Sequence, residues 1–219
     1  ETTLQKKEQI LGARFFDLKN EFSNQKASLP NTVLSAKEFQ ERAQEVGVRK
    51  ESCLVVYDAI GVYSSPRVWW LFKLMGFSNI AVLDGGLPAW KQADYPIENY
   101  QKRQILKGDF ETVYQSQRIA FTEEVLEATK TQVKLILDAR SSDRFYGKTP
   151  EPRKEVRSGC IPTSRSLPYT ILLEGNHFKS KTAILDILEK ENPKRLPLIF
   201  SCGSGITASI LALAAEIAG

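Results

Sequence analysis

Short, almost entirely apolar runs recur along the chain, and the three clearest end at a polar or reactive side chain. The clearest cover residues 53–58, 135–138 and 198–202, and a fourth covers residues 80–83. Continuous runs of this length, rich in aliphatic and β-branched residues, are typical of strands buried on both faces of a parallel sheet. We therefore predict a buried parallel strand at each of them.

Segments with the apolar spacing of a helix separate these runs. They cover residues 35–46, 64–75, 122–130, 182–191 and 206–218. Ser35 stands where an N-cap is expected, and Glu123 and Glu124 suit the first turn of their helix because its N-terminal end is electropositive. Strands that alternate with helices in this way predict an α/β fold built on parallel sheets with helices packed on them.

The chain also contains an internal repeat. When Asp58 is aligned with Cys202, residues 55–61 match residues 199–205, and in both copies an apolar helix that ends at a glycine follows. Self-similarity over so long a period indicates a duplicated structural unit. The second copy stops at Gly219, where the first continues into a further strand, so we expect the second domain to be truncated at its C-terminus.

The repeat and a change in composition together predict the domain organisation. Residues 99–119 are charged and polar with no sustained apolar period, which is typical of a connector. We predict a first domain at residues 1–98, a linker at residues 99–119 and a second domain at residues 120–219.

Composition places the protein in an ordinary globular class. Of its 219 residues, 42% are apolar and 26% are charged, and the net charge of +4 is spread without a dense basic block. This distribution gives little support to a nucleic acid as partner, whereas a small anionic substrate fits it. No apolar run approaches the roughly 18 residues that cross a bilayer, and the N-terminal residues Glu1, Lys6 and Lys7 are charged, so we expect no membrane partner.

Cysteine and histidine usage restricts the chemistry. Three cysteines, at positions 53, 160 and 202, form an odd and sparse set that favours a reducing compartment, and we expect a cytoplasmic protein. The single histidine, His177, excludes a histidine-rich metal site and is interpreted as a surface residue. No spacing implies a metal or an organic cofactor.

Cys202 lies where a predicted strand ends and a Gly-Ser-Gly loop leads into the helix at residues 206–218. Such a loop can direct backbone N–H groups inward, and the N-terminal end of the helix adds positive potential, so negative charge on sulfur is stabilised. A thiolate is a nucleophile that needs no histidine. The alternative interpretation is an inert structural cysteine at a strand end.

Arginines follow the strand at residues 135–138. They are Arg140, Arg144 and Arg153, the last within a Pro-Glu-Pro-Arg run. A guanidinium group presents a planar fork that suits carboxylate, sulfonate or phosphate oxygens. Alone, these residues would be interpreted as surface arginines, and their position after a strand end is what makes them candidates for binding an anion.

Four stretches of the chain resemble the two-domain rhodanese-like sulfurtransferases, in particular the 3-mercaptopyruvate sulfurtransferases, and the similarity extends over nearly the whole chain. The stretches are Ala13-Arg14-Phe15-Phe16-Asp17, Ser65-Pro66-Arg67-Val68-Trp69-Trp70, Leu83-Asp84-Gly85-Gly86-Leu87-Pro88-Ala89-Trp90 and Cys202-Gly203-Ser204-Gly205-Ile206-Thr207-Ala208.

The resemblance implies tandem rhodanese-like domains and a sulfurtransferase. In such enzymes the first domain lacks the catalytic cysteine, and Asp58 stands at that place here. The resemblance implies that Cys202 takes a sulfane sulfur from 3-mercaptopyruvate or thiosulfate as a persulfide and passes it to cyanide or to a thiol, including a thiol protein. It implies that Arg144 and Arg153 bind the anionic end of the donor. The backbone amides expected to cradle the persulfide belong to Gly203, Ser204, Gly205, Ile206 and Thr207.

The sequence departs from the family pattern at four positions, one of which is Thr163, where the family's Ser-Gly-His-Ile-Pro-Gly run ends in glycine. The family often uses a histidine and an acid of the first domain as a relay with the loop serine; Asn31 and Lys19 stand at those positions here. Cys160 replaces the histidine of the family's Ser-Gly-His-Ile-Pro-Gly run, and we interpret it as a surface variant rather than a second redox-active thiol.

Two other functional classes compete with a sulfurtransferase. A phosphatase on the same scaffold needs an arginine six positions after its cysteine, and Ala208 stands there. The other alternative, a non-catalytic rhodanese-like module that binds or regulates a partner, stays open.

We interpret Trp69, Trp70 and Phe72 as core and interdomain packing, Cys53 as an inert core thiol and Arg67 as a structural salt-bridge partner.

Overall fold

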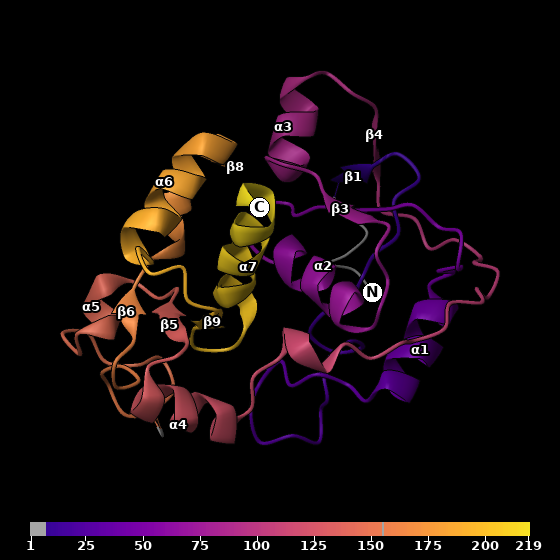
Figure 1. The fold of residues 1–219 in the computed structure, drawn as a ribbon. Helices are drawn as coiled ribbons and strands as arrows, with labels where there is room; N and C mark the ends of the chain where they lie inside the picture. The colour runs from indigo at the N-terminus through magenta and orange to yellow at the C-terminus, as the bar shows by residue number, and fades with distance from the viewer. Residues whose placement is uncertain (1–7, 155) are drawn as a thin grey trace. The chain divides into compact units, whose positions relative to one another are not determined.

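The computed structural model describes residues 8–154 and 156–219. It divides into two compact units, Glu1–Arg118 and Ile119–Gly219, which are described separately (Figure 1). The charged N-terminal residues Glu1, Lys6 and Lys7 lie outside the described part of the chain. None of the helices formed by the described residues is long and apolar enough to cross a membrane.

The first unit contains two pairs of short strands and three helices among its described residues. Strands β2 and β3 are parallel, with Leu54 opposite Ile80, whereas β1 and β4 are antiparallel. Helix α2 packs on β3. The elements are β1 (Glu8–Ile10), α1 (Ala36–Glu45), β2 (Leu54–Val56), α2 (Ser65–Leu74), β3 (Ile80–Val82), α3 (Gly86–Gln92), β4 (Ile97–Asn99) and a 3-10 turn (Ser116–Arg118).

An aromatic cluster forms the core of the first unit. Most of its ring pairs meet edge to face or at a tilt, with Phe39 and Phe72 centred 5.1 Å apart, whereas Phe16 and Phe22 are stacked. Such contacts add to the gain from apolar burial. Trp69 and Phe72 are 3% and 1% exposed, which confirms that they belong to the core. The cluster consists of Phe16, Phe22, Phe39, Phe72, Phe77 and Phe110.

Part of the expected linker packs into this core. Phe110 is 1% exposed and lies against Phe39 and Phe77. The backbone is tied down as well, because Gly108 N donates to Gln44 O at 2.8 Å. Polar composition had suggested a connector, but a single buried ring and its flanking hydrogen bonds are enough to dock the segment on the first unit.

The second unit contains a three-stranded parallel sheet in the order β6, β5, β9. A short antiparallel hairpin of β7 and β8 stands apart from it. The elements are α4 (Thr122–Thr131), β5 (Leu135–Asp138), α5 (Ser142–Phe145), β6 (Arg165–Ser166), a 3-10 turn (Tyr169–Leu172), β7 (Leu173–Glu174), β8 (His177–Phe178), α6 (Lys181–Glu191), β9 (Leu198–Ser201) and α7 (Ile206–Ala218).

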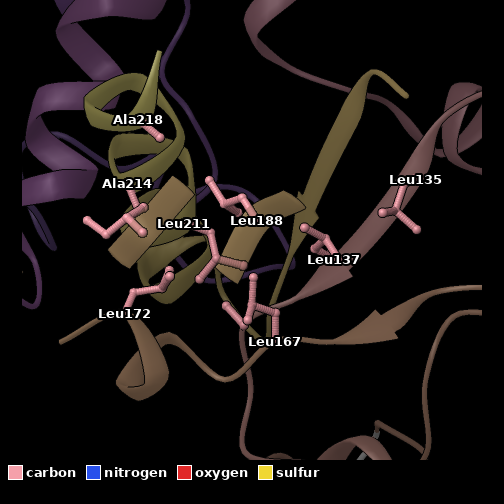
Figure 2. Packing of buried hydrophobic residues seen from close by; sticks show 10 residues of the cluster. Leu135, Leu137, Leu167, Leu172, Leu188, Leu211, Ala214 and Ala218 are labelled. Atoms are coloured by element: carbon pink, nitrogen blue, oxygen red, sulfur yellow. The ribbon is translucent and has the colours of Figure 1, made fainter. Parts of the chain in front are cut away.

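The core of the second unit lies where helices α6 and α7 meet β5. Leu137, Ile184 and Leu211 are fully buried there, and Figure 2 shows leucines from strands and helices directed into the same space. Every residue of β5 is buried, as its sequence predicts. This packing fixes the position of β5 and of α7, and the candidate site lies at the ends of these elements.

Two expectations about the first unit are wrong. Val55 in β2 is 59% exposed, and Cys53 is exposed rather than a core thiol. The two residues are two positions apart and therefore share one face of an extended chain. No described residue of the first unit covers that face of β2. The apolar run at residues 53–58 was therefore wrongly interpreted as a strand buried on both faces.

Candidate active site

Cys202 follows the last residue of β9, next to the end of β5. The two strands are parallel, with Asp138 opposite Ser201, and Ala139 N donates to Ser201 O at 2.8 Å. Because parallel strands end at the same edge of a sheet, the residues that follow each strand meet there. This register brings Cys202 and Arg140 to one edge of the second unit.

The loop after Cys202 directs a backbone amide at the sulfur. Gly205 N donates to Cys202 Sγ at 3.0 Å. Gly205 has a φ of 79°, in the left-handed region that favours glycine, and it is the N-cap of the 13-residue helix α7. The positive end of α7 therefore faces the sulfur, which is half-buried at the edge of the core. Ile206 and Thr207 form the first turn of this helix.

Arg144 and Arg153 both reach Gly203. Arg153 Nη2 donates to Gly203 O at 2.9 Å. A β-carbon placed on Gly203 would lie 2.9 Å from Arg144 Nη2, so the second guanidinium group is adjacent and leaves no room for a side chain. The structure thus brings the two predicted anion-binding arginines to the loop of Cys202.

A buried network of charges lies behind Arg144. Glu151 accepts from Arg144 Nη2 at 2.5 Å and from Arg140 Nη1 at 2.8 Å. Arg140 also donates through Nη2 to Asp138 at 2.6 Å and to Gly159 O at 2.8 Å. The side chains of Asp138, Glu151 and Arg140 are 2%, 5% and 9% exposed. Buried ions need partners of this kind, because an unpaired charge in such a place is costly.

These contacts shift two pKa values. The Arg144 guanidinium donates to Glu151 and holds the pKa of that carboxyl below its ordinary value, with the charge of Arg140 acting in the same direction. Hydrogen bonds from Arg140 to Asp138 raise the pKa of Arg140 above its ordinary value. Both groups are therefore charged near neutral pH.

Sequence reasoning assigned no role to Asp138 or Glu151. A weak signal was present for each: Asp138 is a carboxylate at the end of a fully apolar strand, and Glu151 lies between two prolines and directly before the Pro-Arg step. Neither pattern shows which arginine the carboxylate contacts, because that pairing depends on how the loop folds back on the sheet.

The corresponding loop of the first unit holds a carboxylate. Asp58 is 6% exposed and accepts from the backbone amides of Tyr63, Ser64 and Ser65 at 2.8 to 3.0 Å. The hydroxyl groups of Ser64 and Ser65 donate to it as well. These donors stand at the start of α2, where the helix end also favours negative charge. The Asp58 carboxylate thus occupies the position in this loop where a bound anion would accept the same hydrogen bonds.

Other predicted positions in the first unit have structural surroundings. Arg67 is 6% exposed, donates to Asn31 O at 2.8 Å and lies 4.5 Å from the ring of Trp70. A backbone carbonyl and an aromatic ring thus contact Arg67, which was expected to form a salt bridge. Lys19 is exposed, and its carbonyl accepts from the side chain of Gln25.

In the second unit, Cys160 is exposed, as expected of a surface variant. The carbonyl of the preceding residue, Gly159, accepts from Arg140. His177 is half-buried in β8, opposite Glu174. Within residues 8–154 and 156–219, no group of three or more histidine, cysteine or acidic side chains is placed to hold a metal ion.

Comparisons with known proteins agree on one family. A family model described as "Rhodanese-like domain" matches residues 4–93. The human 3-mercaptopyruvate sulfurtransferase is 34% identical, with an alignment that covers 96% of this chain and 71% of the human protein. The mitochondrial thiosulfate/3-mercaptopyruvate sulfurtransferase 1 of Arabidopsis thaliana is 33% identical over 92% of this chain, which spans 59% of that relative's length.

A solved structure is also similar. The crystal structure of SseA from Escherichia coli, whose title refers to the rhodanese fold and the catalytic mechanism of 3-mercaptopyruvate sulfotransferases, matches with a TM-score of 0.86 and 30% identity. The match covers 96% of this chain and 79% of the other.

Proposed function

Since the chain belongs to the 3-mercaptopyruvate sulfurtransferase family and has its tandem rhodanese-like α/β fold, we propose that it moves a sulfane sulfur through a persulfide on Cys202. The donor is 3-mercaptopyruvate or thiosulfate, and the acceptor is a thiol or cyanide. The observation that carries the proposal is the meeting of Arg144 and Arg153 at Gly203, directly after Cys202.

The first step is attack of the Cys202 thiolate on the donor sulfur. With 3-mercaptopyruvate, a sulfur–sulfur bond forms and the carbon–sulfur bond breaks; the carbon keeps the bonding pair as the enolate of pyruvate, which takes up a proton. With thiosulfate, the bond between the two sulfur atoms breaks and sulfite leaves with the pair. Both routes leave a persulfide on Cys202.

The second step returns the enzyme to its starting state. A thiolate acceptor attacks the outer sulfur and leaves as a persulfide, or cyanide attacks and leaves as thiocyanate, and Cys202 recovers the bonding pair as a thiolate. Dividing the transfer into two displacements replaces one difficult step by two easier ones. Neither displacement calls for a metal or an organic cofactor.

The loop supports both displacements electrostatically. The Gly205 amide and the N-terminal end of α7 face the sulfur, so they stabilise negative charge on Cys202 before attack and on the outer sulfur of the persulfide afterwards. Arg144 and Arg153 supply the fork geometry that holds the carboxylate or sulfonate end of the donor.

Mass spectrometry of the protein after donor treatment tests this proposal. We expect one added sulfur atom on Cys202 with 3-mercaptopyruvate or thiosulfate, and its loss when cyanide or a thiol is added. Replacement of Cys202 by Ser removes the nucleophile, so both the adduct and turnover should fall to background while the circular dichroism spectrum stays unchanged.

Cys160→Ser is the matched control, because it removes an exposed thiol of the same unit. That variant should keep the adduct and the turnover. An added sulfur found on Cys160 instead, or none on folded protein with either donor, would contradict the proposal.

A further inference from the structure

Glu151 is the acid that pairs with both Arg140 and Arg144, and its side chain is 5% exposed. We infer that Glu151 sets the donor preference of the Cys202 site, favouring a donor with one negative charge over a donor with two. The inference rests on the proposed function and adds to it a specificity-determining residue that does not itself touch the donor.

Glu151 holds Arg144 by two contacts. Arg144 donates to it through Nε at 3.2 Å and through Nη2 at 2.5 Å. This side-by-side pairing fixes the plane of the guanidinium group. Because the same Nη2 atom lies beside Gly203, Glu151 positions Arg144 against the loop, and Arg144 keeps further N–H donors beyond the two groups that Glu151 engages.

Glu151 also offsets charge. Five charged side chains are linked by the contacts described: Asp138, Arg140, Arg144, Glu151 and Arg153. Within this group, two carboxylates balance two of the three guanidinium groups, so these five side chains together carry the charge of a single arginine. The Cys202 thiolate is counted separately, and it is absent in the Cys202→Ser protein used for the binding test below. The described contact of Arg153 is with the neutral carbonyl of Gly203, so Arg153 is the guanidinium group that no carboxylate of this cluster is described as pairing with.

The two donors respond differently to that charge. 3-Mercaptopyruvate carries one carboxylate, which one surplus guanidinium balances. Thiosulfate carries two negative charges, and bringing both to a site with the charge of one arginine leaves one of them without compensation. Coulomb attraction scales with the product of the charges, so each positive charge gained by the site strengthens binding of a dianion about twice as much, in free energy, as binding of a monoanion.

Donor binding to protein that cannot react is the direct test. In the Cys202→Ser background, affinities for 3-mercaptopyruvate and for thiosulfate are measured by titration calorimetry, with and without Glu151→Gln. Gln keeps the size of the side chain and one oxygen acceptor but removes the charge. We expect the ratio of thiosulfate affinity to 3-mercaptopyruvate affinity to rise at least tenfold, and to rise less at high salt.

In the reactive protein, the same substitution should shift the corresponding ratio of kcat/KM mainly through KM. Asp143→Asn is the matched control, because it removes one negative charge from an exposed residue on the helix that carries Arg144. This control should leave both ratios within about twofold, because an exposed charge is screened. Glu151→Asp, which keeps the charge, should restore the wild-type ratio even where it weakens both donors.

Arg153→Gln provides the second arm if Glu151→Gln does not fold. Removing the surplus cation should weaken thiosulfate more than 3-mercaptopyruvate, moving the ratio in the opposite direction. Equal weakening of both donors by either variant would mean that Glu151 is only structural and would overturn the inference. The ratio of the two donor affinities is measured without turnover, so it tests the role of Glu151 even if the wild-type protein forms no persulfide. A missing persulfide would count against the proposed function alone.

Discussion

At the scale of single residues, one carboxylate holds together the first unit's counterpart of the Cys202 loop. Asp58 accepts from three backbone amides and two hydroxyl groups. In Asp58→Ala these donors lose their acceptor in a buried place, so we expect the free energy of unfolding to fall by about 3 kcal/mol, measured by urea denaturation. Glu41→Ala, on the exposed side of α1, should cost less than about 0.5 kcal/mol; similar losses for both variants would contradict this account.

Glu151 makes a second residue-scale prediction, in the pH dependence of stability. Its pKa is lowered in the folded protein by the hydrogen bond from Arg144. A carboxyl group with a lowered pKa stabilises the fold fully above its unfolded pKa, and that contribution is lost as the pH falls through the folded value. The difference in unfolding free energy between wild type and Glu151→Gln should therefore be constant near neutral pH and shrink below about pH 4. Denaturation curves over this range check it, and a difference that grows on acidification would show the opposite sign.

Some residues of the candidate site could be predicted from the sequence and others could not. Cys202 was a candidate from its place between a strand and a helix, and the family resemblance implied that Arg144 and Arg153 bind the donor beside it; the structure places both arginines at Gly203. Their catalytic and binding roles stay predictions. The role of Glu151 was not predictable, because a carboxylate between two prolines can turn to any nearby cation until the loop is folded.

At the scale of elements, local signals predicted the helices well. Ser35 forms the expected cap of α1, as a capping box with Glu38, and α7 begins and ends where its apolar spacing predicts. The sequence pattern did not predict the shortest elements: β1 and β4 have three residues each and contain polar side chains, and α5 is a single turn. Such short elements carry little periodicity of their own and depend on the pairing that tertiary structure provides.

The segment after β4 shows how one buried ring can decide where an element belongs. Phe110→Ala removes a ring that is 1% exposed, so we expect a loss of about 3 to 5 kcal/mol in unfolding free energy. Leu106→Ala is the control within the same segment, because Leu106 is 73% exposed, and it should change stability by less than about 0.5 kcal/mol. Thermal and urea denaturation measure both, and equal effects would mean that the segment is a free linker after all.

At the scale of the whole molecule, the alternation of strands and helices was sufficient to predict the α/β class, and the internal repeat predicted a tandem arrangement, which is that of the family. The repeat did not predict how the two copies differ in burial. β5 is buried along its whole length, whereas β2 exposes Val55, although both runs are apolar in sequence. Sequence period reports which residues are apolar, and the surrounding elements determine which of them are covered.

The self-supplied carboxylate of the first unit has a consequence for how the molecule responds to its surroundings. An anion tethered to the loop is present at a constant and high effective concentration, so the amides of Tyr63, Ser64 and Ser65 are occupied whatever the medium contains. The loop at residues 203–207 follows a cysteine instead, whose Sγ accepts from the Gly205 amide, and on the proposed function this cysteine gains and loses a sulfur atom in each cycle. The first loop therefore keeps the same anion at all times, whereas the occupant of the second loop, on the proposed function, changes with each sulfur transfer.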